Sequence, residues 1–349
     1  MSRPTSAMIE RARFSLTPGI SASRATAGST GASGAVPAPG PAVPSPSAPQ
    51  AAGIAAVSSA ARAVSWAIRA SGKAIWSLAV RYPARVHFGL GLNTGYVSLN
   101  TRLPPFTNIR ARQAVNYAID RARIIQLADA APVQAAATCQ MLPPDFPGYR
   151  PYCPYTAGTG DGAWHSPDMA KARRLVRESG TTNVPVTVWS FDSFPGKAAG
   201  SYLVGLLDDL GYRASLHAVP DDRFWTDIDD PRLKIQVSFG GGWGADFPTP
   251  STFFGPLLSC QSADEPVTYN WARFCDPHVD ALVSQAQAAQ LTDPAAARRL
   301  WAQADRIVTG QAPYVPIDNG GTAGFVSSRA GNYQASPVYG PLLDQTWVR

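Results

Sequence analysis

Charged residues are scarce in this sequence of 349 residues, where they make up 15% of the chain. Glycine and proline are abundant instead, with 30 and 32 residues. Such a composition is typical of a chain with many turns or with a disordered share. The hydrophobic content of 45% nevertheless suffices for a real core, in one large domain or two ordinary ones.

An excess of positive charge is missing from most of the chain, although the net charge is +6. Residues 1–80 contain seven basic residues and one acidic residue, so they account for the whole excess. Residues 81–349 are electrically balanced. This distribution predicts no basic face that could hold phosphates, and we expect no nucleic-acid partner.

The sequence contains none of the short motifs that mark common catalytic sites. It has no G-x-S-x-G turn, no H-E-x-x-H helix, no P-loop and no G-x-G-x-x-G after a predicted strand. A lone histidine is more often a surface or core residue than a base, and the four histidines are scattered. We therefore predict a protein that is not an enzyme and holds no cofactor. The alternative is a hydrolase whose site is assembled only in three dimensions.

Cysteine is rare, and its four residues form two local pairs without CxxC spacing. Proline-rich loops flank both pairs, and a disulfide that closes a loop of this length stabilises by about 3 kcal/mol on chain-entropy grounds. We therefore expect disulfides, Cys139 with Cys153 and Cys260 with Cys275, formed in an oxidising compartment. The alternatives are four buried thiols in a cytosolic protein, or a zinc site formed by Cys260, Cys275 and His278. We predict no metal.

Residues 1–80 lack the features of an exported or membrane-spanning segment. Ser21 to Ala61 is almost entirely Ala, Ser, Gly and Pro, which predicts a disordered tail. Residues 55–80 have a faint amphipathic pattern that favours a short helix, not a span of about 20 apolar residues. Residues 1–19 lack the apolar stretch of a signal peptide, and no cysteine for lipid attachment precedes Cys139. The acid-poor start superficially resembles a transit peptide, but low-complexity sequence explains it better.

From Arg81 onward, strand and helix patterns alternate. Apolar runs and period-two alternation predict strands at Tyr96–Leu99, Val184–Phe191, Tyr212–Val219 and Ile235–Phe239. Caps and apolar stripes predict helices at Ile109–Leu127, Ser166–Gly180 and Lys197–Leu210, and two more beginning at Asp276-Pro277 and Asp293-Pro294. Helices between strands indicate an α/β lobe with a mostly parallel or mixed sheet.

A glycine-rich segment, residues 240–250 (GGGWGADFPTP), directly follows the last predicted strand. Ligands of open α/β sheets bind at the carboxyl ends of strands, so this position suits a site. Trp243 offers a flat apolar wall and Asp246 a negative charge, whereas a phosphate loop would need Lys and Ser or Thr. We expect the segment to prefer a cation. The alternative is a tight turn with a capping aspartate.

Several ordered segments resemble one protein family. They are Leu99–Phe106 (LNTRLPPF), Ile109–Arg121 (IRARQAVNYAIDR), Thr138–Tyr155, Pro167–Leu175, Trp243–Asp246 (WGAD) and Gly340–Trp347. Together they resemble the extracellular solute-binding proteins of family 5, the dipeptide- and oligopeptide-binding proteins of ABC importers. The resemblance covers nearly all of residues 81–349 and implies a periplasmic-binding-protein-like α/β lobe with a mixed sheet.

The resemblance also implies a ligand and a site. In this family the aspartate of the W-x-A-D-type motif pairs with the α-amino group of a bound peptide, a role that falls on Asp246, with Trp243, Gly244 and Ala245 beside it. Removing one partner of such a shielded pair costs about 2–5 kcal/mol. The implied partners are short peptides or similar small solutes and an ABC permease in the membrane. The implied location is extracytoplasmic.

The chain departs from the family upstream of Leu99, where members have a large N-terminal lobe that is largely missing here. We expect a tail at residues 1–80, a ligand-binding lobe at 81–313, and a segment at 314–349 that would return to the missing lobe. The alternative function is a truncated remnant or interaction module that keeps the lobe fold. A half-cleft cannot exclude water, so Asp246 would then gain less from its partner.

Overall fold

A mixed sheet of seven strands organises the computed structural model, which describes residues 72–128, 135–158 and 160–349. The strands follow the order β1-β7-β2-β6-β4-β5, and β3 pairs with β7. Strand β4 is parallel to β5 and β6, and the remaining pairs are antiparallel. The strands are β1 (Val86–Leu90), β2 (Asn93–Leu99), β3 (Ala135–Ala137), β4 (Pro185–Phe191), β5 (Arg213–Val219), β6 (Val237–Gly244) and β7 (Tyr314–Phe325).

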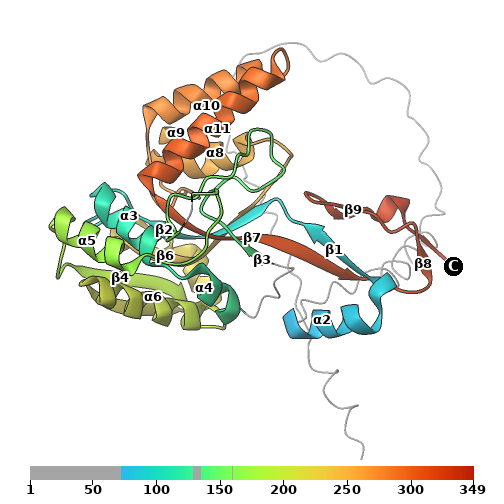
Figure 1. Ribbon diagram of the computed structural model, residues 1–349, viewed down its shortest axis with the longest axis horizontal. Helices are drawn as coiled ribbons and strands as arrows, with labels where there is room; N and C mark the ends of the chain where they lie inside the picture. Colours follow the sequence, from blue (N-terminus) through green and yellow to red (C-terminus); the bar gives the residue numbers. More distant parts are fainter. Residues whose placement is uncertain (1–71, 129–134, 159) are drawn as a thin grey trace, which may run out of the picture. The chain divides into compact units, whose positions relative to one another are not determined.

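Helices cover both faces of this sheet (Figure 1). One face carries α3 (Ile109–Ala118), α4 (Arg121–Leu127), α5 (Met169–Ser179) and α6 (Gly196–Leu210). The other carries α7 (Asp221–Asp227), α8 (Ser251–Leu258), α10 (Pro277–Ala289) and α11 (Pro294–Gln311). In the part of the chain that is described, no helix combines the length and the apolar character needed to cross a membrane.

Short elements complete the described structure. They are α2 (Gly72–Arg81), α9 (Cys260–Asp264), the 3-10 helices Pro83–Arg85, Pro231–Leu233 and Leu343–Gln345, and the strands β8 (Ala330–Gly331), β9 (Ala335–Ser336), β10 (Gly340–Pro341) and β11 (Trp347–Val348).

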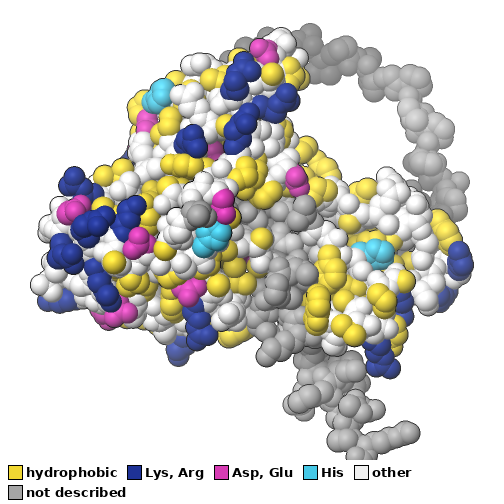
Figure 2. Space-filling model, viewed as in Figure 1, with side chains coloured by type: hydrophobic (Ala, Val, Ile, Leu, Met, Phe, Trp, Pro, Cys, Tyr) yellow, Lys and Arg dark blue, Asp and Glu magenta, His cyan; other side chains and the backbone are white. Residues whose placement is uncertain are grey.

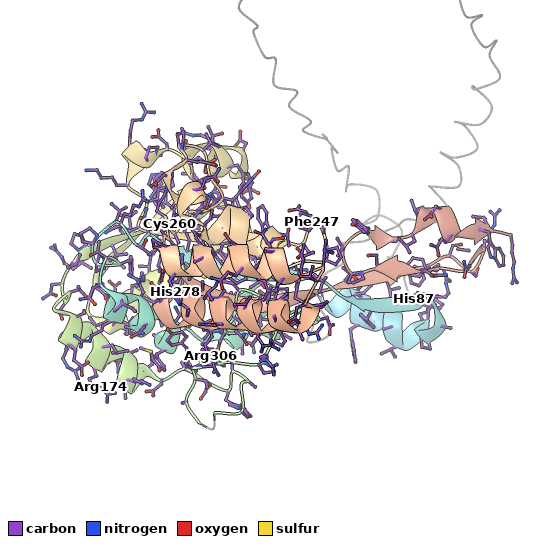
Figure 3. All side chains as sticks on the ribbon, turned by 90° about the horizontal axis from the view of Figure 1, so that it is seen from above. His87, Arg174, Phe247, Cys260, His278 and Arg306 are labelled. Carbon is purple, nitrogen blue, oxygen red and sulfur yellow. A yellow bond between two sulfur atoms is a disulfide. The ribbon has the colours of Figure 1, made fainter. Side chains whose placement is uncertain are left out.

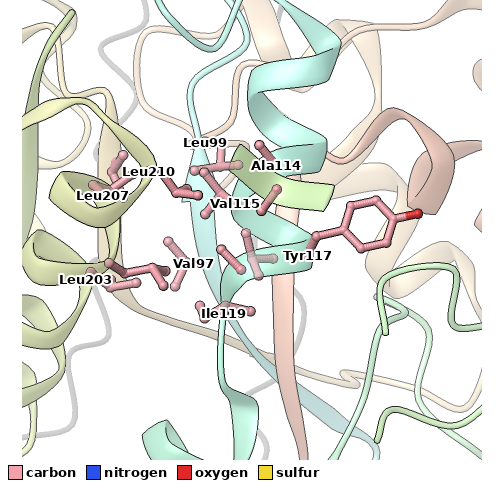
Figure 4. Close-up of a cluster of buried hydrophobic side chains, with 14 of the residues drawn as sticks. Val97, Leu99, Ala114, Val115, Tyr117, Ile119, Leu203, Leu207 and Leu210 are labelled. Atoms are coloured by element: carbon pink, nitrogen blue, oxygen red, sulfur yellow. The ribbon is translucent and has the colours of Figure 1, made fainter. Parts of the chain in front are cut away.

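Each face of the sheet has its own core. On the α3–α6 face, Val97 and Leu99 of β2 meet Val115 of α3 and Leu203 and Leu207 of α6, all fully buried (Figure 4). Tyr96, the residue before Val97, lies on the opposite face of the strand and belongs to the other core with Phe253 and Trp301. Since both faces are covered, β2 buries apolar side chains on each of its sides, Val97 and Leu99 on one and Tyr96 on the other.

The predicted helix Ile109–Leu127 is wrong as one element, because the chain breaks at Ile119 and Asp120 into α3 and α4. Asp120 is extended, and its carboxylate accepts the Arg123 N–H at 2.9 Å, so it caps a new helix. Arg121 then turns inward, where its Nε donates to the carbonyls of Thr138 and Pro316. The continuous apolar stripe predicts one helix over residues 109–127. The chain changes direction at Asp120, and this change allows the Arg121 side chain to reach the two buried carbonyls.

The other predicted helices are confirmed with one shifted boundary. The helix predicted from Ser166 begins at Met169, because Asp168 is the residue that accepts a backbone N–H, from Lys171. Asp276 and Asp293 cap α10 and α11 as expected. The predicted disorder of residues 21–61 lies outside the described residues. The domain boundaries at 80/81 and 313/314 stay predictions; residue 314 begins β7, whose first half pairs with β2.

Candidate functional site

The predicted strand Ile235–Phe239 does not end before the glycine run, and no tight turn begins at Gly240. Strand β6 continues through the run to Gly244 and pairs with β2 along its length. Gly240 is the extra residue of a bulge, since Tyr96 pairs with Gly241 and Val97 with Phe239. Its φ of +124° favours glycine.

Two aromatic rings explain why glycines stand in this strand. A Cβ at Gly240 would lie 2.3 Å from the Phe191 ring, and one at Gly241 would lie 2.5 Å from the Tyr96 ring. At these two positions the missing side chains make room for core aromatics. The loop after β6 begins only at Ala245, whose N–H donates to the Leu92 carbonyl at 2.8 Å.

Asp246 lies in this loop, one residue beyond Ala245, and its side chain is exposed. Its Oδ2 accepts a hydrogen bond from the Thr252 hydroxyl at 2.9 Å, and its backbone N–H donates to the same hydroxyl oxygen at 3.0 Å. No described residue donates to its other oxygen, Oδ1, or forms an ion pair with it. The N-cap of the following helix α8 is Pro250, so Asp246 does not cap that helix.

Trp243 is held by the same threonine. Its indole N–H donates to the Thr252 carbonyl at 2.8 Å, and Thr252 itself is buried at the start of α8. The ring of Trp243 packs against that of Tyr269, with the centroids 4.9 Å apart. The structure thus brings an anchored carboxylate and a half-buried aromatic wall together, with Gly244 exposed between them.

Sequence reasoning missed further aromatic residues near the end of the sheet. Trp225 of α7 lies with its ring centroid 5.4 Å from Phe191 and 5.8 Å from Trp271, yet half of its surface is exposed. Tyr269 is also exposed. These residues come from separate elements, and no local pattern connects them in the sequence.

Both expected disulfides are present. The Cα atoms of Cys139 and Cys153 lie 5.1 Å apart, and those of Cys260 and Cys275 lie 4.2 Å apart. Because Cys260 and Cys275 are joined to each other, they cannot act as separate zinc thiolates with His278, which lies in the first turn of α10 (Figure 3). Within the described ranges, no group of at least three His, Cys, Asp or Glu residues is arranged to hold a metal.

The histidines do not converge on a site. His87 packs against Tyr333, His217 against Trp189, and His165 contacts the carboxylate of Asp161. Charge is likewise mixed: on the face shown in Figure 2, acidic side chains lie among the basic ones.

Comparison with known proteins places this geometry in a family. The model for bacterial extracellular solute-binding proteins, family 5 (middle region), matches residues 52–265. Heme-binding protein A of Haemophilus influenzae is 29% identical over 274 residues, which cover 73% of this chain and 45% of that protein. A glutathione-binding protein of Escherichia coli (strain K12) is 26% identical over 226 residues, covering 64% of this chain and 41% of that protein.

Solved structures show the same fold. A clavulanic acid biosynthesis oligopeptide-binding protein superposes with a TM-score of 0.69 at 22% identity, covering 78% of this chain and 50% of its own. The periplasmic binding protein DppA of Helicobacter pylori, in complex with the peptide STSA, gives 0.66 at 21% identity, covering 80% and 51%. The predicted periplasmic-binding-protein-like lobe with a mixed sheet is therefore confirmed. The chain spans about half the length of these relatives or less, and it belongs to the bacterial extracellular solute-binding proteins of family 5.

Proposed function

We propose that this chain is the substrate-binding component of an ABC importer and that it binds short peptides or similar cationic solutes. The observation that carries the proposal is the Asp246 carboxylate, exposed after β6 and anchored by Thr252. Its Oδ1 is available to accept from a ligand ammonium, whose charge it would pair. The α-amino group of a peptide supplies such an ammonium.

The surroundings of Asp246 suit an amine that is attached to an organic body. The Thr252 hydroxyl fixes the carboxylate before the ligand arrives, so less conformational freedom is lost on binding. Trp243 and Tyr269 offer ring faces to the remainder of the solute. Main-chain hydrogen bonds would hold an extended peptide, while open space around its side chains would permit broad specificity.

We favour a binding protein over an enzyme. The relatives are binding proteins by name, and the His residues of this chain point to separate neighbours. The proposed mechanism needs only recognition, so we assign no catalytic residue, metal or cofactor.

We also propose that the chain acts outside the cytoplasm with an ABC permease as its partner. Its family consists of extracellular proteins. Two disulfides suit an oxidising compartment, because cytosolic thiols are kept reduced.

Calorimetry with trialanine tests the proposal. We expect measurable heat with the wild type and an affinity about fivefold weaker in Asp246→Asn, since a charge pair at an exposed site is worth up to about 1 kcal/mol. Asp209→Asn is the matched control, because Asp209 is an exposed carboxylate near the last turn of α6. No heat with the wild type would contradict peptide binding and would leave a remnant or interaction module.

A further inference from the structure

A cavity of about 260 Å³ lies on the sheet face that carries α4 and α6. Its walls come from β2, β3, β6 and β7, from the end of β4, from α4 and from the start of α6. The walls are largely apolar and include Ile124, Ile125, Phe191, Phe239 and Ile317. Pockets for whole drug-sized ligands measure roughly 300–1,000 Å³, so this one fits a single side chain or a small group.

One carboxylate interrupts the apolar wall. Asp318 of β7 is the only charged residue among those lining the cavity. Its side chain extends over Gly95 of the paired strand β2, where a Cβ would lie 2.6 Å from the Asp318 Oδ1. A glycine at this position therefore leaves room for the carboxylate.

Asp318 has no partner in the described residues: none donates a hydrogen bond to its carboxylate or forms an ion pair with it. The side chain is half-buried, and burial raises the pKa of Asp318 to about 6. The other titratable group in the wall is the phenol of Tyr96, whose pKa burial also raises. At neutral pH the cavity thus presents a negative charge without a counter-charge.

We propose that this cavity is a subsite for a cationic group on an apolar stem, an amine or a guanidinium, whose charge pairs with Asp318. The proposal deepens the proposed function and rests on it, since it names the solute class: peptides or similar molecules with a Lys-like or Arg-like side chain. The carboxylate of this subsite, Asp318, is distinct from that of the proposed amine site, Asp246. Asp246 follows the end of β6, whereas the cavity is lined by Gly240 and Gly241 within that strand.

Other ligand classes fit this cavity less well. An anion would face the Asp318 charge. A neutral apolar group would fill the walls but leave a half-buried carboxylate unpaired, which costs free energy. A hard metal ion needs several oxygen ligands, and the wall offers one carboxylate among apolar side chains.

Small probes test the subsite without depending on peptide binding. NMR titrations of the whole chain would compare n-butylammonium with its neutral counterpart n-butanol at pH 7.5. We expect the wild type to prefer the ammonium about tenfold, because a partly buried charge pair contributes more than an exposed one. The preference should fall at pH 5, where Asp318 is mostly protonated. Asp318→Asn should bind both probes equally.

Two further variants keep the test decisive. Asp246→Asn should retain the preference for ammonium, because Asp246 lies outside the cavity lining. A wild type that binds no trialanine but keeps this preference would sink the proposed function and leave the subsite standing. Gly95→Ala crowds the carboxylate and should weaken the ammonium preference, which supplies a readout if Asp318→Asn fails to fold. Equal affinity for both probes in the wild type, no binding of either, or a preference retained in both Asp318→Asn and Gly95→Ala would overturn the subsite.

Discussion

The Thr252 hydroxyl holds Asp246 at two points, by accepting from its backbone N–H at 3.0 Å and donating to its Oδ2 at 2.9 Å. The carbonyl of Thr252 also holds the indole of Trp243. Thr252 is buried, whereas Asp246 is exposed. One buried residue thus positions both parts of the proposed amine site.

Thr252→Val should loosen the carboxylate while preserving the shape of the buried side chain. We expect a loss of about 1 kcal/mol in the free energy of unfolding, since the hydroxyl makes its hydrogen bonds in a buried position. Trialanine affinity should fall several-fold by calorimetry. Thr252→Ser keeps the hydroxyl and should restore that affinity; an unchanged affinity in Thr252→Val would show that the anchor has no role in binding.

The buried Asp305 should make stability depend on pH. Its carboxylate accepts from the Gln140 side chain at 2.6 Å and from the Leu142 N–H at 3.3 Å, yet burial raises its pKa to about 6. The folded state therefore holds a proton that the unfolded chain releases above about pH 4, so stability falls as the pH rises from about 4 to about 6.

Replacing this carboxylate checks the sign of that effect. Urea unfolding at pH 4.5 and at pH 7 gives the free energy of unfolding that each protein loses as the pH rises between these values. The loss should be smaller in Asp305→Asn than in the wild type, by on the order of 2 kcal/mol. Asp318 is unchanged in both proteins, so its own titration cancels. The same pH slope in both proteins would mean that Asp305 titrates alike in the folded and unfolded states.

The two disulfides should stabilise the loops that they close. Replacing Cys139 and Cys153 together by serine should lower the free energy of unfolding by about 3 kcal/mol, and the same holds for Cys260 and Cys275. Thermal unfolding of the two double variants measures this. Mass-spectrometric mapping of protein purified without reductant should find both pairs; four free thiols would contradict an oxidising compartment.

Much of the fold follows from local sequence signals. Two Asp-Pro caps, at Asp276 and Asp293, mark the starts of helices correctly. Two left-handed glycines, Gly180 and Gly211, mark helix ends correctly. Each of these residues satisfies backbone groups of its own helix. Period-two alternation likewise predicts β4. These features depend on neighbours in the sequence.

Errors arose where distant residues decide the structure. The break between α3 and α4 places Arg121 against carbonyls of Thr138 and Pro316. The glycines of β6 accommodate rings of Tyr96 and Phe191. Of the site, the sequence predicts the exposed Asp246 and its neighbour Trp243, and their role in binding stays a prediction. It does not predict Asp318, because only the pairing of β7 with β2 sets it beside Gly95.

The most direct measurement is the coupling between the Asp246 carboxylate and a ligand α-amino group. Calorimetry would give four affinities, for trialanine and N-acetyl-trialanine with the wild type and with Asp246→Asn. We predict that acetylation weakens binding to the wild type about fivefold and has little effect in Asp246→Asn, because each change removes one partner of the same pair. Equal losses on acetylation in both proteins would contradict the pairing.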